Sequence, residues 1–359
     1  MKILLLAGEE SGMLYARGLR ARLAGHDVRG YQDYGFETAD LAVMGFIPVL
    51  MRLPFLLRVK RTMERVIEEW RPDVVCTIDY PGMNLKLAAF AKARGIRAVH
   101  VVCPQVWAWH QDRIPKIEAS LDALCCFFPF EPALFKPGFA TFVGHPLAKE
   151  FSCVKACRPA SNGNPLVAIL PGSRTGEIVK IFPTLLEVAD RMKGAKFAVP
   201  AANRKAHALI TKLVERHGAC DRVEVQLGGA RELLGSAECA VVASGTATLE
   251  AALARCPTVL VYRVGPLLAA IARRVIKGTK YIGLANIIWE RCHGEGDSPP
   301  MPELLQEDFT ADSVAAILTK WLADAEERKK VSERLDKTVR RIDSPGEPLE
   351  KIVGIITQS

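Results

Sequence analysis

Asp79 is the residue whose type and position in this sequence suggest chemistry most directly. It follows Asp73–Ile78, an apolar run typical of a buried strand, and lies in the segment Thr77–Gly82. A carboxylate at the carboxyl end of such a strand can accept the proton of a hydroxyl nucleophile. A loop-capping aspartate would fit this position equally well, so the residue types alone leave both roles open.

Two further segments, each directly after an apolar run, could hold an anionic ligand. Gly8–Gly12 offers glycines and a helix start, although it lacks the GxGxxG pattern of dinucleotide binding. In Ser244–Glu250, the hydroxyls of Ser244 and Thr246 and the N–H groups of a helix start could hold a diphosphate. Glu250 could then accept hydrogen bonds from ribose hydroxyls. Simple N-capping of the two helices is the alternative.

Two more polar segments follow predicted strands. In Leu170–Arg174, the guanidinium of Arg174 could bind a phosphate through paired hydrogen bonds, or it could form a surface salt bridge with Glu177. In Pro104–His110, two tryptophans two positions apart could form the wall of a sugar or acyl site, or they could pack between domains.

Residues 47–61 combine apolar and basic side chains without a single acid. This combination suits docking on an anionic membrane surface, at about 1 kcal/mol for each cation near the lipid. The alternative is a core helix with a basic end, broken by Pro54. The residues that we expect to dock are Leu50, Met51, Arg52, Leu53, Phe55, Leu56, Arg58, Lys60 and Arg61.

The composition is that of a globular protein, with 49% hydrophobic and 25% charged residues. It excludes a disordered chain, a collagen-like fibre and a small disulfide scaffold. The net charge of +8 favours anionic partners, although it would also serve solubility. The ten cysteines lack zinc-binding spacing, so we expect no metal and reduced thiols in a cytosolic protein. No apolar run reaches the roughly 18 residues of a membrane span.

The elements that must position these residues alternate between short apolar runs and amphipathic stretches, which predicts parallel sheets with helices on both faces. The segment Cys153–Pro165, rich in Pro, Asn, Gly and Ser, predicts a linker, so we expect two doubly wound Rossmann-like domains facing across a cleft. The predicted limits are 1–160, 161–335 and a tail at 336–359 that packs on the other domain or on a partner subunit. The predicted strands are Ile3–Ala7, Asp73–Ile78, Ala98–Val102, Leu121–Phe128, Leu166–Leu170, Phe197–Pro200, Val223–Gln226, Ala240–Ala243 and Thr258–Tyr262, and the predicted helices are Leu14–Leu23, Leu85–Arg94, Ile178–Met192, Thr248–Ala254 and Thr310–Lys337.

Taken in order, the motifs of the whole chain resemble those of the lipid-A-disaccharide synthase family. Each motif alone is weak, but jointly they are highly specific. The family's GExSGD, LAVMG, IDxPDFN, PQVWAW, FPFE, GHPL, LPGSR, SGTATLEAAL and PELLQ are matched, fully or in part, by Gly8–Gly12, Leu41–Gly45, Ile78–Asn84, Pro104–Trp109, Phe128–Glu131, Gly144–Leu147, Leu170–Arg174, Ser244–Leu253 and Pro302–Gln306.

The resemblance implies a GT-B glycosyltransferase of lipid A biosynthesis that needs no metal or cofactor. Such an enzyme transfers 2,3-diacylglucosamine from its UDP derivative to 2,3-diacylglucosamine 1-phosphate (lipid X), inverting the anomeric centre and releasing UDP. It works in the cytoplasm as a peripheral protein on the inner face of the bacterial inner membrane. The resemblance also suggests a homodimer formed by C-terminal segments.

The resemblance assigns roles to individual residues. Asp79 matches the family's essential acid and is our candidate base for the acceptor 6-hydroxyl, and Ser11 and Glu9 match residues near the reacting centre. The positions that match substrate or UDP contacts are Gly12, Gln105, Arg174, Ser244, Gly245, Thr246, Thr248, Glu250 and Asn286.

Three departures from the family's motifs leave alternatives open. Met13 and Gly82 stand where the motifs have acids, and residues 289–300 are altered and extended at the expected nucleotide pocket. One alternative is a related GT-B enzyme that uses another UDP-sugar, although the LAVMG and PQVWAW motifs argue against it. The other is a non-catalytic relative that binds lipid or nucleotide. A nucleic-acid partner is disfavoured, because the basic residues are not interleaved with aromatic ones in a known module.

Overall fold

The computed structural model of the chain describes residues 1–37, 41, 52–151, 164–265, 269, 274, 278–293 and 298–358, except for the side chains of Glu10, Ser11 and His293. The chain forms two compact units. Unit 1 comprises Met1–Pro146 and Ser344–Ser359, and unit 2 comprises Leu147–Asp343. These limits differ from the predicted 1–160, 161–335 and 336–359, and most of the predicted linker lies outside the described residues.

Unit 1 is built on a six-stranded parallel sheet with the strand order β2-β1-β3-β4-β5-β6. The order reverses direction between β1 and β3, as it does in doubly wound sheets of the 2-1-3-4-5 type. The strands are β1 (Lys2–Ala7), β2 (Asp27–Arg29), β3 (Val74–Ile78), β4 (Arg97–Val101), β5 (Ala123–Cys126) and β6 (Ala140–Phe142).

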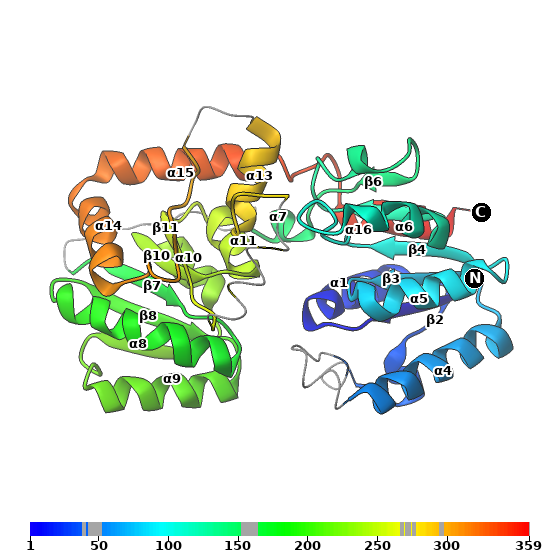
Figure 1. The fold of residues 1–359 in the computed structure, drawn as a ribbon, viewed down its shortest axis with the longest axis horizontal. Helices are drawn as coiled ribbons and strands as arrows, with labels where there is room; N and C mark the ends of the chain where they lie inside the picture. The colour runs from blue at the N-terminus through cyan, green and yellow to red at the C-terminus, as the bar shows by residue number, and fades with distance from the viewer. Residues whose placement is uncertain are drawn as a thin grey trace. The chain divides into compact units, whose positions relative to one another are not determined.

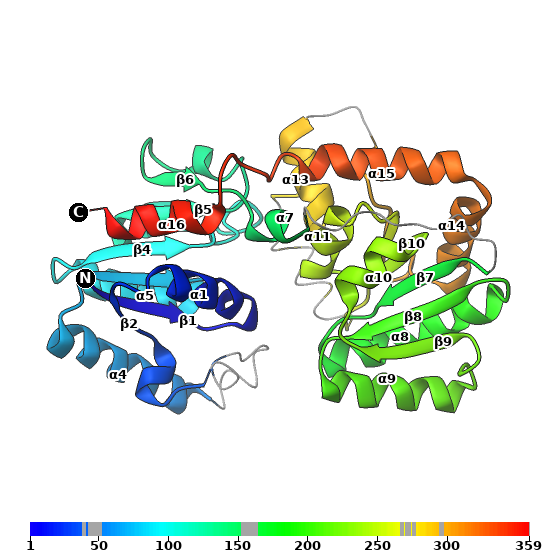
Figure 2. The same cartoon turned by 180° about the vertical axis from the view of Figure 1, so that it is seen from behind.

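Helices cover both faces of this sheet, because β1, β3 and β4 are apolar on both sides. On one face, α1 (Glu10–Arg22) packs beside α16 (Pro348–Thr357), as Figure 2 shows. The other face carries α4 (Leu53–Trp70), α5 (Pro81–Lys92) and α6 (Ile114–Ser120) (Figure 1). The short 3-10 helices of unit 1 are η1 (Tyr31–Tyr34), η2 (Gln111–Arg113) and η3 (Pro132–Leu134).

The C-terminal segment returns to unit 1, where α16 completes the core. Ile352 and Ile356 are fully buried in the same cluster as Leu19 and Leu23 of α1. Gly18 makes this close approach possible, because a Cβ there would lie 2.6 Å from a methyl carbon of Leu349. Residues 344–359 of the predicted tail are therefore an integral part of the N-terminal Rossmann-like unit, whereas residues 336–343 belong to unit 2.

Unit 2 has its own six-stranded parallel sheet, with the strand order β12-β11-β10-β7-β8-β9. Counted from its first strand, this is the Rossmann order 3-2-1-4-5-6, which reverses direction between β7 and β10. The strands are β7 (Leu166–Leu170), β8 (Lys196–Ala201), β9 (Val223–Leu227), β10 (Cys239–Ala243), β11 (Thr258–Tyr262) and β12 (Glu303–Leu305).

The helices of unit 2 form two groups. In one, α14 and α9 both pack against α8, and in the other, α11 packs against α10, α13 and α15. A single helix was predicted over 310–337, but the structure has two, because Asp324 adopts an extended conformation and caps the second. The helices are α7 (Pro146–Phe151), at the border of the two units, α8 (Thr175–Arg191), α9 (Arg204–His217), α10 (Ala230–Ser236), α11 (Thr246–Leu253), α13 (Leu284–His293), α14 (Ala311–Ala323) and α15 (Ala325–Val339).

Candidate active site

Several of the predicted site residues lie where the strand order of each sheet reverses, whereas Gln105 follows β4 and Asn286 lies in α13. Open α/β sheets bind ligands at this point, beyond the carboxyl ends of the strands. In unit 1 the loops after β1 and β3 meet there, and they carry Glu9 and Asp79. In unit 2 the loops after β7 and β10 meet there, and they carry Arg174 and Ser244.

Asp79 sits in a strained turn between β3 and α5. Both Asp79 and Tyr80 adopt the left-handed conformation, with φ of 50° and 51°, which costs a non-glycine residue about 1–3 kcal/mol. The backbone N–H of Asp79 still donates to Val101 O at 2.9 Å, and the N–H of Tyr80 donates to Asp79 Oδ1 at 2.8 Å. The surrounding structure therefore fixes the direction of the carboxyl group.

Asn84 is the residue that holds this turn, and our sequence analysis did not select it. Its side chain has 0% exposure. The amide nitrogen donates to the carbonyl oxygens of Leu6 (3.2 Å), Ile78 (3.1 Å) and Asp79 (2.8 Å), and its oxygen accepts from the Tyr31 hydroxyl at 2.8 Å. One side chain thus ties the end of β1 to the Asp79 turn. The available signal was an asparagine five residues after the aspartate, in the first turn of α5.

Glu9 and the Asp79 turn are brought together through Tyr80. A Cβ at Gly8 would lie 2.4 Å from Cδ1 of Tyr80, so only glycine lets this ring rest on the β1 loop. Burial raises the pKa of Tyr80, and the charge of Glu9 raises it further. Gly12 is less crowded, since a Cβ there would lie 3.4 Å from Ile78 O, close to an ordinary van der Waals contact. The side chain of Ser11 lies outside the described residues.

The two positions that depart from the family's acids have different surroundings. Met13 is partly buried against the core of unit 1, and its sulfur accepts a hydrogen bond from Gln32 Nε2 at 3.3 Å. Gly82 is exposed in the first turn of α5, and a Cβ there would meet no atom within 4 Å.

The tryptophans after β4 have separate environments. Trp107 is buried and donates to Glu131 Oε1 at 3.2 Å, while Trp109 is 42% exposed, as an aromatic wall would be. Gln105 is also exposed in this loop. Glu131 accepts a second hydrogen bond from the N–H of Phe128 at 3.0 Å, and burial raises its pKa to about 8. The motifs Pro104–Trp109 and Phe128–Glu131, which are distant in sequence, therefore pack together as one layer at the carboxyl edge of the unit 1 sheet.

A cluster that the sequence analysis missed lies below this layer. The ligand atoms of Cys103, Cys126 and Glu131 are all within 4.8 Å of one another, and all three residues are buried. The spacing in the sequence gave no sign of it, because the cluster joins the ends of β4 and β5. Glu131 already accepts hydrogen bonds from Trp107 and Phe128, so we attribute the cluster to the packing of unit 1 and do not assign a metal site to it.

In unit 2, Arg174 lies at the N-cap of α8 beside the end of β11. Its Nη1 donates to Glu177 Oε1 at 2.8 Å, and its side chain remains half exposed. Burial raises the pKa of Tyr262, with the charges of Glu177 and Arg174 acting in opposite directions. Gly172, with φ of 101°, leaves room for Glu177, because a Cβ there would lie 2.6 Å from its carboxylate. The salt bridge that we weighed as an alternative therefore exists.

The loop after β10 ends in Gly245, which caps α11 with φ of 150° and is exposed together with Thr246. Thr248 is fully buried; its hydroxyl donates to Gly245 O at 2.8 Å and accepts from Leu284 N at 3.3 Å. Glu250 is half buried near the ion pair of Arg231 and Glu150, and burial raises its pKa.

Asn286 is fully buried and braces the segment on the other side of this loop. Its amide donates to Met301 O and to Glu303 Oε1, both at 2.8 Å, and its oxygen accepts from Met301 N at 3.1 Å. Glu303 in turn accepts from the N–H groups of Ile282 and Gly283 at 3.0 Å. Thr248 and Asn286 were predicted to contact the substrate or UDP, but both are buried and hydrogen-bond to the surrounding protein, so they present no side chain at the surface.

A cavity of about 520 Å³ opens at the carboxyl ends of β10, β11 and β12. Of the predicted nucleotide-side residues, Ser244 lines it, together with Tyr262, Tyr281 and Gln306. This volume falls in the range of small-molecule sites, roughly 300–1,000 Å³. Tyr281 packs edge-on against Trp289, which belongs to the altered segment, at a ring distance of 6.2 Å. Trp289, at the start of the altered segment, thus supports a residue of the cavity wall without lining the cavity itself.

The predicted docking segment forms the start of α4, apart from Leu50 and Met51, which lie outside the described residues. Leu53 and Leu57 are 44% and 42% exposed, and Arg52, Arg58 and Arg61 are exposed on the same helix. Two predicted docking residues, Phe55 and Leu56, instead pack half-buried against the core. Lys60 forms an ion pair with Glu64. In the described part of the chain, no helix is long and apolar enough to cross a membrane.

Comparison with known folds places both units in one architecture. The chain superposes on the kitacinnamycin glycotransferase with a TM-score of 0.61 at 15% identity, covering 98% of this chain and 97% of that one. It superposes on a UDP-GlcNAc 2-epimerase from Neisseria meningitidis with a TM-score of 0.56 at 12% identity, covering 99% of each chain. The expected fold class, two Rossmann-like α/β domains of the GT-B type, is therefore confirmed.

Comparison of sequences identifies the family. The model of the lipid-A-disaccharide synthetase family matches residues 3–347. The lipid-A-disaccharide synthase of Chromohalobacter salexigens is 36% identical, covering 93% of this chain and 91% of that protein. The corresponding Pseudomonas putida protein is 34% identical, covering 99% and 98%. The chain belongs to the lipid-A-disaccharide synthase family, the glycosyltransferases of lipid A biosynthesis.

Proposed function

We propose that this enzyme transfers 2,3-diacylglucosamine from UDP-2,3-diacylglucosamine to the 6-hydroxyl of 2,3-diacylglucosamine 1-phosphate, with Asp79 as the general base. The observation that carries the proposal is the placement of Asp79. Its carboxyl group stands at the switch point of the unit 1 sheet, on a strained turn held by the buried amide of Asn84. Strain of this kind is characteristic of functional sites.

The proposed reaction is a single displacement. Asp79 accepts the proton of the acceptor 6-hydroxyl while the oxygen of that hydroxyl attacks the anomeric carbon of the donor. The bond from that carbon to the diphosphate breaks with its electron pair, so the configuration inverts and UDP leaves. Glu9 lies beside this turn, where its carboxylate orients the acceptor.

The residues of unit 2 are proposed to hold the UDP part of the donor. The backbone N–H groups of the exposed residues Gly245 and Thr246 at the start of α11, the hydroxyls of Ser244 and Thr246 and the guanidinium of Arg174 stabilise the charge that develops on the diphosphate. The uridine occupies the cavity beside Ser244. Glu250, one turn into α11, accepts hydrogen bonds from the ribose hydroxyls. Thr248 and Asn286 keep the loop in place.

We further propose that the enzyme docks on the inner face of the inner membrane through the start of α4. Leu53 and Leu57 would enter the interface, while Arg52, Arg58 and Arg61 would meet anionic headgroups. Pairing of two chains through C-terminal segments rests on the family resemblance alone. Light scattering of the purified protein tests it, and a monomer at micromolar concentration would contradict it.

The test of the proposed function is UDP release from UDP-2,3-diacylglucosamine in detergent micelles, with and without the phosphorylated acceptor. We expect UDP release that depends on the acceptor, and a product with the mass of the disaccharide 1-phosphate. UDP binding without turnover would contradict the proposal and favour a non-catalytic binding protein. Turnover with a different UDP-sugar would favour a related glycosyltransferase.

A further inference from the structure

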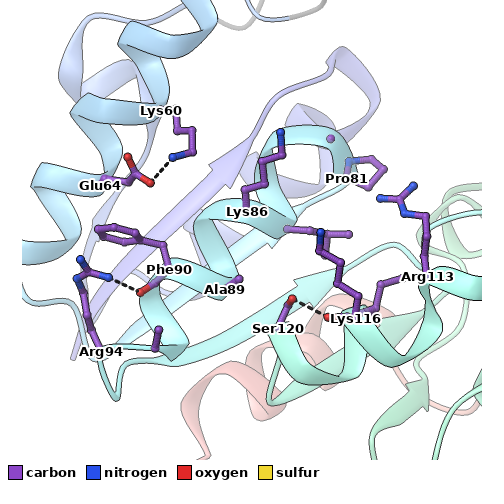
Figure 3. Close-up of a pocket in the computed structure, with 14 residues that line it drawn as sticks. Lys60, Glu64, Pro81, Lys86, Ala89, Phe90, Arg94, Arg113, Lys116 and Ser120 are labelled. Atoms are coloured by element: carbon purple, nitrogen blue, oxygen red, sulfur yellow. Dashed lines mark hydrogen bonds and ion pairs between the residues drawn. The ribbon is translucent and has the colours of Figure 1, made fainter.

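A groove of about 430 Å³ lies on unit 1 between α4, α5 and α6, and the proposed reaction has not used it. Figure 3 shows it running along α5 from Pro81, at the start of the helix, to Arg94 beyond its end. Pro81 is two residues after Asp79, so one end of the groove adjoins the turn that carries the proposed base.

The side chains around the groove are strongly cationic. Five basic residues line it, and Glu64 is the only acid among the described residues that do so. Two of the cations have acidic partners, because Lys60 pairs with Glu64 and Arg94 pairs with Glu68. The five basic residues are Lys60, Lys86, Arg94, Arg113 and Lys116.

The three remaining cations gather at the Pro81 end. In the described part of the chain, the side chains of Lys86, Arg113 and Lys116 form no ion pair and no hydrogen bond, although the backbone oxygen of Lys116 accepts from the Ser120 hydroxyl at 2.6 Å. They come from α5, η2 and α6, and Figure 3 shows them around the same space beside Pro81. Unpaired cations from three separate elements that border one groove indicate a binding site for an anion with more than one oxygen, such as a phosphate.

The floor of the groove is apolar. It is formed by Leu85, Ala89 and Phe90 of α5 and by Ile117 of α6. At the far end the guanidinium of Arg94 lies 3.4 Å above the ring of Phe90 and closes the groove. A hydrocarbon chain placed along this floor would be removed from water at about 25 cal/mol per Å².

We infer that this groove binds the acceptor of the proposed reaction, with the 1-phosphate at Lys86, Arg113 and Lys116 and the neighbouring acyl chain on the apolar floor. The inference rests on the proposed function. It follows from the chemistry of the acceptor, in which the phosphate on C1 is next to the acyl chain on C2 and one sugar ring away from the 6-hydroxyl. A phosphate at the Pro81 end would thus leave the 6-hydroxyl near Asp79.

Gly82 adds no negative charge to this end of the groove, whereas the family's motif has an acid at this position. It lies four residues before Lys86 on α5, where an acidic side chain would face that lysine across one helical turn. Since a Cβ at Gly82 would meet no atom within 4 Å, the position accepts a side chain without a clash. This feature gives an isosteric test, because Gly82→Asp adds one negative charge and Gly82→Asn adds the same shape without it.

The experiment compares two acceptors, 2,3-diacylglucosamine 1-phosphate and its dephosphorylated form, in micelles. For Lys86→Ala/Lys116→Ala we expect kcat/KM with the phosphorylated acceptor to fall about 100-fold, since a hydrogen bond to a charged group contributes about tenfold for each lysine. With the dephosphorylated acceptor the variant should equal the unmodified enzyme. Lys329→Ala/Lys330→Ala, which removes two exposed lysines from α15, is the control and should change neither value.

The glycine variants separate charge from folding. Gly82→Asp should weaken binding of the phosphorylated acceptor about tenfold relative to Gly82→Asn, while UDP binding stays the same for both. Equal effects of both Gly82 variants, or an equal loss of the two acceptors in the lysine variant, would overturn the inference. A loss of vesicle binding with unchanged acceptor kinetics would assign the groove to membrane phospholipid instead. If the unmodified enzyme shows no transfer, the proposed function fails before the groove is tested.

Discussion

At the scale of single residues, Asn84 is the side chain that holds the turn carrying the proposed base, Asp79. Its amide satisfies three carbonyl oxygens at the switch point and holds two consecutive left-handed residues in place. Asp79 could be predicted from the sequence because a polar residue directly after a buried strand is conspicuous. The role of Asn84 could not, because its four partners come from β1, β3, η1 and the turn, and only the folded sheet brings these together.

The first prediction concerns this amide. Asn84→Ala would remove the hydrogen bonds that the amide donates to three carbonyl oxygens and would leave the buried Tyr31 hydroxyl without its acceptor, and we expect a loss of about 3 kcal/mol in the free energy of unfolding. Asn203→Ala, which removes the N-cap of α9 in unit 2, is the control and should cost about 1 kcal/mol. Urea denaturation measures both. An Asn84→Ala variant that is no less stable than Asn203→Ala would contradict the assigned role.

The second prediction concerns Glu131, whose pKa burial raises to about 8. Between the unfolded pKa of about 4.5 and pH 8, the folded state keeps a proton that the unfolded state releases, so this residue lowers stability as pH rises. Glu131→Gln should therefore gain stability relative to the unmodified protein, by up to about 1.4 kcal/mol per pH unit. Urea denaturation at pH 5.5 and 7.5 tests this. The exposed Glu187→Gln is the control, and parallel pH profiles for all three proteins would refute it.

At the scale of elements, the sequence predicted elements well where the apolar pattern extended over many residues, and it failed where the pattern was short or interrupted. The apolar runs 73–78, 166–170 and 240–243 match β3, β7 and β10 closely, because strands buried on both faces need continuous apolar sequence. The edge strands β2, β6 and β12 have only three residues each, too few for a period to show. Pro345-Gly346 suggested a tail, but α16 begins directly after it with a proline in its first turn.

The third prediction belongs to the start of α4. Arg58→Glu/Arg61→Glu should reduce co-sedimentation with vesicles that contain phosphatidylglycerol at least tenfold, because each cation near anionic lipid contributes about 1 kcal/mol. The remaining binding should be less sensitive to salt. Lys329→Glu/Lys330→Glu on α15 makes the same change in charge elsewhere and should leave binding intact. Equal binding of both variants would exclude docking through α4.

At the scale of the whole molecule, the two units repeat one principle with different strand orders. Each sheet places its predicted polar loops at the point where the order reverses: Gly8–Gly12 and Asp79 in unit 1, and Leu170–Arg174 and Ser244–Glu250 in unit 2. The alternation of strands and helices predicted this fold class. It could not predict that the chain returns to unit 1 at Ser344, because that step depends on long-range packing of α16 on α1.

The central claim is that this molecule transfers a sugar with Asp79 as the base. The most direct measurement is the rate of disaccharide formation by the unmodified enzyme and by Asp79→Asn, read by mass spectrometry, with Asp221→Asn at an exposed position of unit 2 as the control. We predict that Asp79→Asn lowers kcat by about 100-fold or more while UDP affinity is unchanged, and that Asp221→Asn is fully active. Disaccharide formation by Asp79→Asn at the unmodified rate would contradict the claim.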